Sequence, residues 1–541
     1  MEIHGENSFK IKSYSNAAFV IEKLPVELST LPEEKIFSIK GIGDAIGKKI
    51  ISQIETGSLK LLEDYLANTP KGILEMLRIK GIGPKKIATI WKELEIENIG
   101  ELLYACNENR LLLFKGFGAK TQQNIKESIE FFQKNIGSYQ YAAIENYALA
   151  FTQKIQEVFP DFHCIPTGIF RRNMPVIDQL EWVTTIEKNK LADYFKLNSY
   201  KKVFEEEDVV HFKGEENVLL LFYLANSENF FTKLFRHSCS KEFLNAWLVK
   251  FPLNMNYVDE AAIFAEAGVS YIPPFLRETE AIIQKAKEGN LPVPIEFPDV
   301  RAVIHSHSKW SDGVNSIEEM AVAAKEKGYE YLVISDHSKS AFYANGLDEK
   351  RIFAQHEEID SLNKKLAPFK IFKSIESDIL NDGNLDYAEN ILTTFDLVIA
   401  SVHSNLKMTE EKAMSRLMAA IQNPFTNILG HMTGRLLLSR NGYPVDHEKI
   451  IDACAKLNVV IEINAHPKRL DIDWKWIPYC LEKNVLLSID PDAHSIHGFA
   501  DIRFGVLAAQ KGGLTKENNL SSFSLAAFEL FLKKQQAKRN T

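Results

Sequence analysis

The sequence contains little cysteine, no long apolar run and no excess of positive charge. Its five cysteines lie far apart and form no Cys-x-x-Cys pair, which argues against both a zinc ribbon and a disulfide framework. No apolar run approaches the roughly 20 residues that span a bilayer, so we expect no membrane segment. The amino terminus lacks the basic stretch and apolar core of a secretory signal, and we therefore expect a cytoplasmic protein.

The formal net charge of -8 gives the chain no global basic field that would attract nucleic acid. Any binding of DNA must therefore depend on a local surface. With 541 residues the chain is too long for one core, while its 45% apolar and 25% charged residues are typical of globular proteins. These values predict a protein of about three or four domains.

The first part of the chain repeats a pattern of apolar residue, Lys, Gly, apolar residue and Gly, followed by a helical stretch with basic residues. A Gly-x-Gly turn that enters a helix exposes backbone N–H groups, which accept phosphate without reading bases. Three copies favour helix-hairpin-helix binding of the DNA backbone over simple helix packing. The glycines and following lysines are Gly41, Gly43, Lys48 and Lys49; Gly81, Gly83, Lys85 and Lys86; and Gly116, Gly118 and Lys120.

A cluster of Gly289, Pro292, Pro294 and Pro298 interrupts the second half of the chain. Such a cluster cannot continue a helix or a central strand, so residues 287–300 are predicted to be a linker. Before it, residues 137–286 mix strands and helices. After it, strands alternate with helical patterns to the end of the chain, which is typical of a barrel or a doubly wound α/β domain.

Strand-like runs after the linker each finish on a polar residue of a type that binds metal or phosphate. In parallel barrels the carboxyl ends of the strands converge on one face, so these side chains are expected to meet. His305 and His307 have the period-two spacing of neighbours on one face of a strand. The runs are Val303–His307, Tyr331–His337, Ile371–Glu376, Leu397–His403, Asn427–His431, Val459–Asn464 and Val485–His494.

The candidate ligands are six histidines, two aspartates and one glutamate. A lone histidine is more often a core or surface residue than a ligand, but coincidence does not account for six of the 14 histidines at strand ends. The set is too large for one ion, and we predict two or three divalent ions, Mn or Zn with Fe as an alternative and Mg less favoured, that promote hydrolysis of a phosphoester. The ligands are His305, His307, Asp312, His337, Glu376, His403, His431, Asp492 and His494.

These motifs resemble the PHP phosphoesterase domain. The resemblance implies a distorted seven-stranded barrel with three metals. It places His305, His307, Glu376 and Asp492 on one metal, Glu376, His403 and His431 on a second, and Asp312, His337 and His494 on a third, with Glu376, Asp312 and His337 in catalysis. Nearby cations are candidates to hold substrate phosphate, although solvation at the surface is the commoner role for each one: Lys339, Arg435, Arg469 and Arg503.

The hairpins, the opening segment Glu6 to Tyr14 and the fusion to PHP together resemble a bacterial family X DNA polymerase over the whole chain. This resemblance implies a multidomain α+β fold. An all-α region would comprise an 8-kDa-like helix-hairpin-helix domain (1–66) and a fingers-like domain with two further hairpins (67–136). An α/β nucleotidyltransferase-like palm with a thumb (137–286, degenerate), the linker (287–300) and a distorted (β/α)7 PHP barrel (301–541) would follow.

Lys49 matches the position of the deoxyribose-phosphate lyase nucleophile in some members of that family. A lysine amine forms a Schiff base when its pKa is lowered. A lysine that contacts phosphate is the interpretation we favour.

The palm motif is degenerate. In the family, a Gly-Ser pair and an Arg precede two aspartates one residue apart, and a third aspartate comes from a later strand. Here Ile169 replaces the serine, Gln179 and Glu181 replace the two aspartates, and Leu219 replaces the third. A register shifted by one would pair Asp178 with Leu180. One carboxylate cannot organise two metals, so we predict that the polymerase site is lost, the alternative being a palm whose acids lie elsewhere.

The sequence thus predicts a monomeric DNA-repair enzyme that binds gapped, nicked or 3'-recessed DNA regardless of its sequence. Its expected activity is 3'-5' exonuclease, or processing of 3' ends and abasic sites. One alternative is an active gap-filling polymerase that also has exonuclease activity. Another is a small-molecule phosphatase of the histidinol-phosphatase type, against which the hairpins argue.

Overall fold

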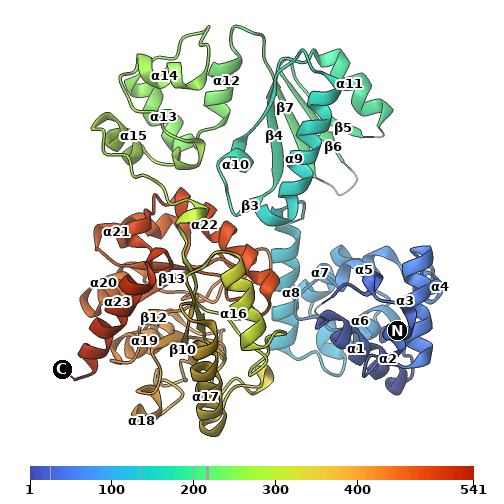
Figure 1. Ribbon diagram of the computed structural model, residues 1–541. Coiled ribbons are helices and arrows are strands. Elements are labelled where there is room, and N and C mark those ends of the chain that lie inside the picture. Colours follow the sequence, from blue (N-terminus) through green and yellow to red (C-terminus); the bar gives the residue numbers. More distant parts are fainter. Residues whose placement is uncertain (25, 135, 199, 215–217, 541) are drawn as a thin grey trace. The chain divides into compact units, whose positions relative to one another are not determined.

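The computed structural model describes residues 1–24, 26–134, 136–198, 200–214 and 218–540. The chain divides into two compact units, Met1–Ile136 and Gly137–Thr541. Figure 1 shows an all-helical first unit and a second unit in which strands and helices alternate. Among the helices described, none has the length and apolar character that a bilayer crossing requires.

The first unit consists of short helices joined by the glycine turns. The apolar members of the repeated pattern, Ile42, Ile79, Ile82 and Phe117, are buried. The first glycine of each turn has a left-handed φ, between +90° at Gly81 and +101° at Gly41, which a side chain would oppose. The helices are α1 (Ser8–Glu22), α2 (Glu33–Ser38), α3 (Asp44–Thr56), α4 (Lys60–Ala67), α5 (Lys71–Met76), α6 (Pro84–Lys92), α7 (Ile99–Asn107) and α8 (Ala119–Lys134).

The second unit begins with a five-stranded sheet of order β2-β4-β7-β6-β5, in which β4 and β7 are parallel. Aromatic side chains form its core, with Trp182 stacked on Phe222 and Phe195 stacked on Phe212. The strands are β2 (Cys164–Thr167), β4 (Gln179–Thr184), β5 (Lys201–Glu205), β6 (Val209–Lys213) and β7 (Leu219–Leu224). The helices beside them are α9 (Tyr141–Val158), α10 (Gly168–Arg171) and α11 (Lys188–Leu197). Two short strands, β1 (Tyr139–Gln140) and β3 (Val176–Ile177), pair with each other.

Four helices follow the sheet and pack around Phe235, Trp247 and Phe264. They are α12 (Phe230–His237), α13 (Lys241–Lys250), α14 (Glu260–Glu266) and α15 (Glu280–Lys287). The predicted linker then leads to the barrel. Its residue Ile295 is fully buried, and the backbone N–H of Ile295 donates to the carbonyl of Leu514, so this part of the linker packs on the barrel.

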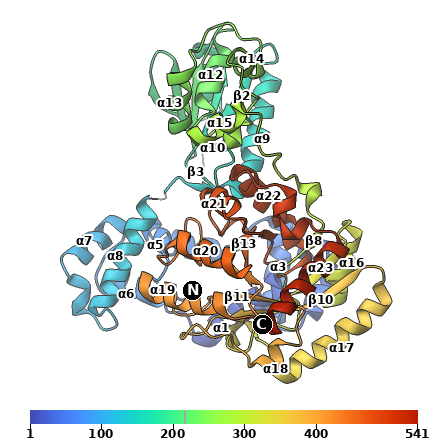
Figure 2. The same cartoon turned by 90° about the vertical axis from the view of Figure 1, so that its left-hand side faces the viewer.

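The rest of the chain forms seven parallel strands in sequential order, a nearly closed barrel. Alternation with helices explains the parallel arrangement, because each helix returns the chain to the same end of the sheet. Figure 2 shows the surrounding helices. The strands are β8 (Ala302–Val303), β9 (Tyr331–Ile334), β10 (Lys370–Asp378), β11 (Leu397–Ser401), β12 (Ile428–Leu429), β13 (Val460–Asn464) and β14 (Leu487–Asp490).

Helices cover the outside of the barrel, and one helix also packs against the apolar cluster inside it. Tyr331 and Phe372 from the strands meet Phe528 of α23, with the rings of Tyr331 and Phe528 stacked 4.6 Å apart. The helices are α16 (Ile317–Glu326), α17 (Glu349–Leu366), α18 (Glu389–Leu392), α19 (Glu410–Gln422), α20 (His447–Leu457), α21 (Ile477–Glu482), α22 (Ile502–Lys511) and α23 (Leu525–Ala537).

The first barrel strand is shorter than predicted. The strand β8 ends at Val303, and His305 has a left-handed φ of +56°, so Val303–His307 is not one continuous strand. The physical reason is closure of the barrel. Beyond Val303 the chain turns to pair with the end of β14, with the His307 N–H donating to the Ala493 carbonyl and the Ala493 N–H donating to the His305 carbonyl. A bend, rather than strand alternation, therefore places these two imidazoles.

Candidate metal centre

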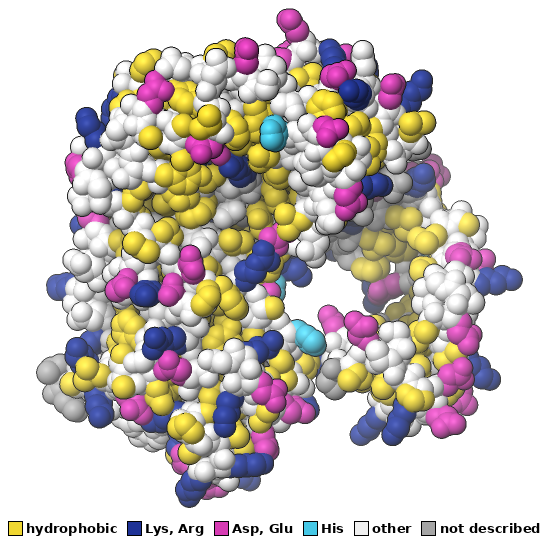
Figure 3. Space-filling model, turned by 45° about the horizontal axis from the view of Figure 1, so that its top comes forward, with side chains coloured by type: hydrophobic (Ala, Val, Ile, Leu, Met, Phe, Trp, Pro, Cys, Tyr) yellow, Lys and Arg dark blue, Asp and Glu magenta, His cyan; other side chains and the backbone are white. Residues whose placement is uncertain are grey.

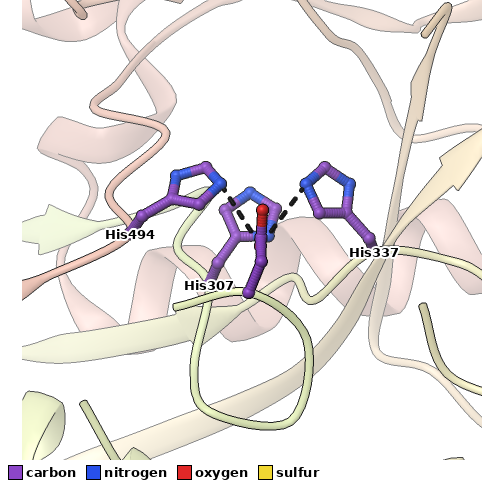
Figure 4. Close-up of side chains that lie close together, drawn as sticks. His307, His337 and His494 are labelled. Carbon is purple, nitrogen blue, oxygen red and sulfur yellow. Dashed lines mark ion pairs between the residues drawn. The ribbon is translucent and has the colours of Figure 1, made fainter. Parts of the chain in front are cut away.

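The barrel brings together all nine predicted ligands at the carboxyl ends of its strands. Seven of them are buried or nearly so, whereas the side chains of Asp312 and His494 remain 30% and 41% exposed. Figure 4 shows the imidazoles of His307, His337 and His494 turned toward one another. Stretches of chain that are remote in sequence meet here because the strands are parallel and their carboxyl ends share one face.

Glu376, at the end of the long strand β10, lies at the middle of the cluster and is fully buried. Its Oε1 lies 3.0 Å from His431 Nε2, 3.1 Å from His403 Nε2 and 3.3 Å from His305 Nε2. Its Oε2 lies 2.9 Å from His337 Nδ1. One carboxylate thus faces four imidazoles, which is the geometry that a bridging ligand requires.

The two aspartates serve the other side of the cluster. Asp492 Oδ1 lies 3.0 Å from His307 Nε2. Asp312 Oδ1 lies 3.4 Å from His494 Nε2 and 3.7 Å from His337 Nε2. Asp312 comes from the loop after β8, so this loop must fold back over the strand ends to complete the set.

Three overlapping groups have ligand atoms within 4.8 Å of one another. The three residues expected on the third metal lie together, and His307 joins them. The other groups fall within the sets expected for the first and second metals, apart from His337, which joins the second. The groups are His307, Asp312, His337 and His494; His305, His307 and Asp492; and His337, Glu376 and His403.

The donor atoms fit divalent ions. Several buried nitrogens and one carboxylate oxygen make no hydrogen bond of good geometry to the described residues, although Glu376 Oε2 and His337 Nδ1 lie 2.9 Å apart. This arrangement is costly unless something else fills those positions. Imidazole nitrogen mixed with carboxylate oxygen is the donor set of Zn, Mn and Fe. The atoms are His305 Nε2, His307 Nδ1, His337 Nδ1, His431 Nδ1 and Glu376 Oε2.

The electrostatics of the protein alone also favour a cation in this cluster. Burial by itself would lower the pKa of His403, but the Glu376 and Asp378 carboxylates raise it to about 10. Burial would likewise lower the pKa of His494, but the carboxylates of Asp312 and Asp492 raise it to about 9. The carboxylates of the cluster therefore favour positive charge beside them, which metal ions would also supply.

Two carboxylates that the sequence analysis missed support the ligands from behind. Glu462 on β13 accepts a hydrogen bond from His305 Nδ1, and its other oxygen accepts from the backbone N–H of His431 at 2.6 Å. Asp378 on β10 accepts from His403 Nδ1. Such carboxylate–histidine pairs fix the tautomer, so that Nε2 presents its lone pair to a metal. A buried acid within the apolar strand Val460–Asn464 was the available signal for Glu462.

The backbone at the centre adopts left-handed conformations, with φ of +56° at His305, +52° at Asp492 and +21° at His431. Residues with a side chain rarely adopt them, and such conformations cluster at functional sites. The hydrogen bond from the His431 N–H to Glu462 and the pairing of Ser306 with Ala493 hold them in place.

All four predicted phosphate-holding cations are paired with carboxylates of the protein, three of them with carboxylates outside the predicted metal ligands. Lys339 pairs with Glu349, Arg435 with Asp473, and Arg503 with Glu145 of α9. Their pairing offsets part of the positive charge that would attract phosphate, and their role in holding phosphate stays a prediction. Arg469 differs, because its Nε lies 3.7 Å from Asp492 Oδ2, directly beside the metal cluster.

In the first unit the second glycine of two turns caps a helix: Gly43 precedes α3 and Gly83 precedes α6, and neither provides a side-chain cap. The first turn of α3 contains the acidic Asp44, whereas α6 begins Pro84-Lys85-Lys86. Lys49 donates from Nζ to the carbonyl of Ala45 at 3.2 Å. Figure 3 shows acidic and basic side chains intermixed on the visible face, so these hairpins are local features rather than part of a basic field.

In the palm, no residue on the described part of β7 offers a carboxylate beside the predicted positions Gln179 and Glu181. Parallel pairing of β4 with β7 sets Gln179 beside Leu219 and Glu181 beside Leu221. Glu181 is buried and accepts from Tyr223 Oη at 2.8 Å. It also accepts from the backbone N–H of Ile169, and a Cβ on Gly168 would lie 1.9 Å from Glu181 Oε1. The carboxylate therefore fills the turn where the family places its phosphate-binding serine.

Comparisons with known proteins follow the same domain order. The helix-hairpin-helix domain family matches residues 1–59, the SAM-like helix-hairpin-helix tandem family matches 73–130, and the PHP domain family matches 304–466.

A probable phosphatase of Thermoanaerobacter sp. (strain X514) is 30% identical over 30% of this chain and 62% of its own length. The protein named DNA polymerase/3'-5' exonuclease PolX of Bacillus subtilis (strain 168) is 32% identical over 99% of this chain and 97% of its own length. The chain therefore belongs to the PolX family of family X DNA polymerases, with helix-hairpin-helix domains followed by a C-terminal PHP domain.

Proposed function

We propose that this chain is a DNA-repair nuclease that hydrolyses 3' ends with two or three divalent metal ions in its PHP barrel, on a polymerase scaffold that no longer synthesises DNA. The observation that carries the proposal is Glu376, a buried carboxylate that faces four imidazoles. The named activities of the Bacillus relative, polymerase and 3'-5' exonuclease, supply the substrate class. We also propose that the protein acts as a cytoplasmic monomer.

The nine residues would hold the ions, and Glu376, one of the nine, would be a ligand that the ions share. Ions bound there supply Lewis acidity toward phosphate oxygens and make water acidic enough to attack phosphorus near neutral pH. Glu462 and Asp378 keep His305 and His403 in the tautomer that presents Nε2. Arg469 is placed to balance negative charge on a phosphate bound beside Asp492. Hydrolysis breaks the bond from phosphorus to the 3' oxygen of the penultimate sugar, and that oxygen takes the proton.

The helical hairpins would hold the DNA. Backbone N–H groups at helix starts contact phosphate irrespective of sequence, and Lys85 and Lys86 add charge at the second hairpin. We assign Lys49 to the same role, since its Nζ contacts a backbone carbonyl on its own helix. Gapped, nicked or 3'-recessed DNA is the proposed substrate, because each exposes a 3' end.

The loss of polymerase activity rests on the environment of Glu181. Its carboxylate already accepts hydrogen bonds from Tyr223 and Ile169, which leaves it a poor ligand for two ions. The neighbouring arginines are also engaged: Arg171 donates to Glu260, and Arg172 pairs with Glu278 at 2.8 Å. A triphosphate would find neither the metals nor the guanidinium groups that it needs.

The experiment combines metal analysis with a nuclease assay. Protein purified without chelator should contain two or three transition-metal ions per chain and shorten a labelled 3'-recessed primer, and chelation should stop the reaction until Mn²⁺ or Zn²⁺ is restored. Hydrolysis of histidinol phosphate without any action on DNA would instead support a small-molecule phosphatase. Nuclease activity that persists through exhaustive chelation would overturn the proposal.

A further inference from the structure

The loop after His337 buries its small residues and exposes its largest ones. Ala341, Ala344 and Leu347 are almost completely inaccessible. Phe342 is 86% exposed and Tyr343 is 63% exposed. Burying the two rings would normally be favourable, so a well-packed loop that presents them to solvent needs an explanation. We call Phe342 and Tyr343 the aromatic pair.

The loop is fixed to both segments that carry the outer metal ligands. Its end returns to its start, where the Leu347 N–H donates to the carbonyl of His337 at 2.9 Å. Asn345 Nδ2 donates to the carbonyls of Trp310 and Ser311, which directly precede the ligand Asp312. The aromatic pair therefore projects from a turn that is connected directly to His337 and to the loop of Asp312.

The flank of the loop is held as well. The N–H of Ser340 donates to Asp386 at 2.6 Å and the Ser340 hydroxyl donates to the same carboxylate at 2.5 Å. A Cβ on Gly346 would lie 1.9 Å from the carbonyl of Ser338, so the two arms of the loop touch. These interactions hold the base of the loop rigid and keep the aromatic pair in place before any ligand arrives.

Tyr343 lies within electrostatic range of the metal-site carboxylates. Burial of its hydroxyl end, together with Asp378, Glu376 and Asp312, raises the pKa of this phenol. Arg469 acts on the same hydroxyl in the opposite direction. The geometry agrees, because the hydrogen bonds of the loop join it to the segments of His337 and Asp312.

We propose that the aromatic pair is a stacking platform for the base of the 3'-terminal nucleotide. The inference rests on the proposed nuclease function. A nucleobase is separated from its own phosphate by one sugar, so a phosphate in the metal centre brings the terminal base to the neighbouring wall. Aromatic side chains bind bases of any kind by stacking, which suits an enzyme that does not read sequence.

The relative orientation of the rings limits how they act. Their centroids are 6.1 Å apart and their planes differ by 77°. One ring can therefore stack face to face on a base while the other meets its edge. Two flat surfaces at this angle form a corner suited to one flat base.

The test compares the double variant Phe342→Ala/Tyr343→Ala with the unchanged protein on two primers with unpaired 3' ends. One primer ends in a normal nucleotide and the other in a tetrahydrofuran residue that lacks the base. We expect kcat/KM on the normal primer to fall about 10-fold to 100-fold and kcat/KM on the abasic primer to stay the same. The exchange Phe342→Tyr/Tyr343→Phe should restore activity, because both residues remain aromatic.

Phe297→Ala is the matched control, since Phe297 is 45% exposed and lies just before β8, at the amino end of the strands. An unchanged metal content would show that the centre is intact. An equal loss on both primers, or no loss on either, would overturn the stacking role and leave the nuclease function standing. Failure of the unchanged protein to hydrolyse either primer would instead remove the proposed function itself.

Discussion

The barrel and the palm both place acidic residues on parallel strands, but among the described residues the barrel leaves atoms of its acidic and histidine side chains without hydrogen bonds, whereas Glu181 in the palm is fully engaged. Glu376 Oε2 has no hydrogen-bond partner among the described residues, and nitrogens of four nearby histidines share that condition. Glu181 in the palm accepts from Tyr223 and Ile169 and has no second carboxylate beside it on the described part of β7. The difference teaches that an acidic residue becomes a metal ligand through what surrounds it, as well as through its position in a motif.

The largest expected effect comes from Glu376→Gln. Removing the shared negative charge should lower the rate of 3'-end hydrolysis by about 10³-fold, since both ions lose a ligand. The metal content, measured by mass spectrometry, should fall as well. Glu181→Gln makes the same chemical change in the palm and should alter neither quantity. Similar losses in the two variants would erase the distinction between the two regions.

A smaller effect is expected from the supporting carboxylates. Glu462→Gln and Asp378→Asn should weaken metal binding by about 10-fold to 100-fold, because His305 and His403 lose the partner that fixes their tautomer. Competition with a chelating dye measures this directly. Asp360→Asn, whose parent carboxylate pairs with Lys373 at 2.7 Å, is a control that should bind metal normally. Full affinity in Glu462→Gln would show that His305 needs no such support.

The hairpins should give a still smaller, salt-dependent effect. Lys85→Ala/Lys86→Ala is expected to weaken DNA binding several-fold and to lower the slope of log affinity against log salt by about 2, because each of the two lysines would otherwise neutralise one phosphate. Fluorescence anisotropy over a salt series provides the slope. Lys10→Ala removes a lysine of the same unit that pairs with Glu6 and should leave the slope nearly unchanged. If it lowered the slope equally, the effect would come from overall charge.

The smallest effect concerns the stability of the palm. Burial raises the pKa of Glu181, so the folded protein holds this proton more tightly than the unfolded chain. Ionisation of Glu181 therefore costs stability as the pH rises above its ordinary pKa near 4.5. Glu181→Gln cannot ionise and should gain stability relative to the parent, by about 1 kcal/mol or less, between about pH 5 and pH 8. Hydrogen exchange of the β4 amides measures the difference, and a relative loss at high pH would place a cation beside Glu181.

The sequence predicted which side chains would meet in the barrel because most of them come at the end of an apolar strand. Strand alternation with helices was enough to predict a parallel barrel and the convergence of its strand ends. The sequence could not predict the backbone conformation of His305. Its left-handed φ follows from the pairing of Ser306 with Ala493, two residues that are nearly 190 positions apart in the chain. The pairing of Arg503 with Glu145 spans an even longer stretch of the chain. Local patterns carry no information about such partners.

The supporting carboxylates and the aromatic pair were missed for a different reason. Glu462 looks like one acid in an apolar strand, and Phe342 and Tyr343 look like ordinary core residues of a loop. Their roles follow from burial and exposure, which only the folded chain determines. The palm was predicted in part. The sequence shows that its aspartates are replaced, but it does not show the hydrogen bonds that Glu181 accepts.

The most direct test of the central claim is a single assay on a gapped duplex with Mn²⁺ and all four deoxynucleotides, run with the parent protein, Glu376→Gln and Glu181→Gln. The account predicts that the parent and Glu181→Gln shorten the primer and that Glu376→Gln leaves it unchanged, with no extension by any of them. Templated extension that survives Glu376→Gln and disappears with Glu181→Gln would contradict the account, because the palm would then hold a working polymerase site.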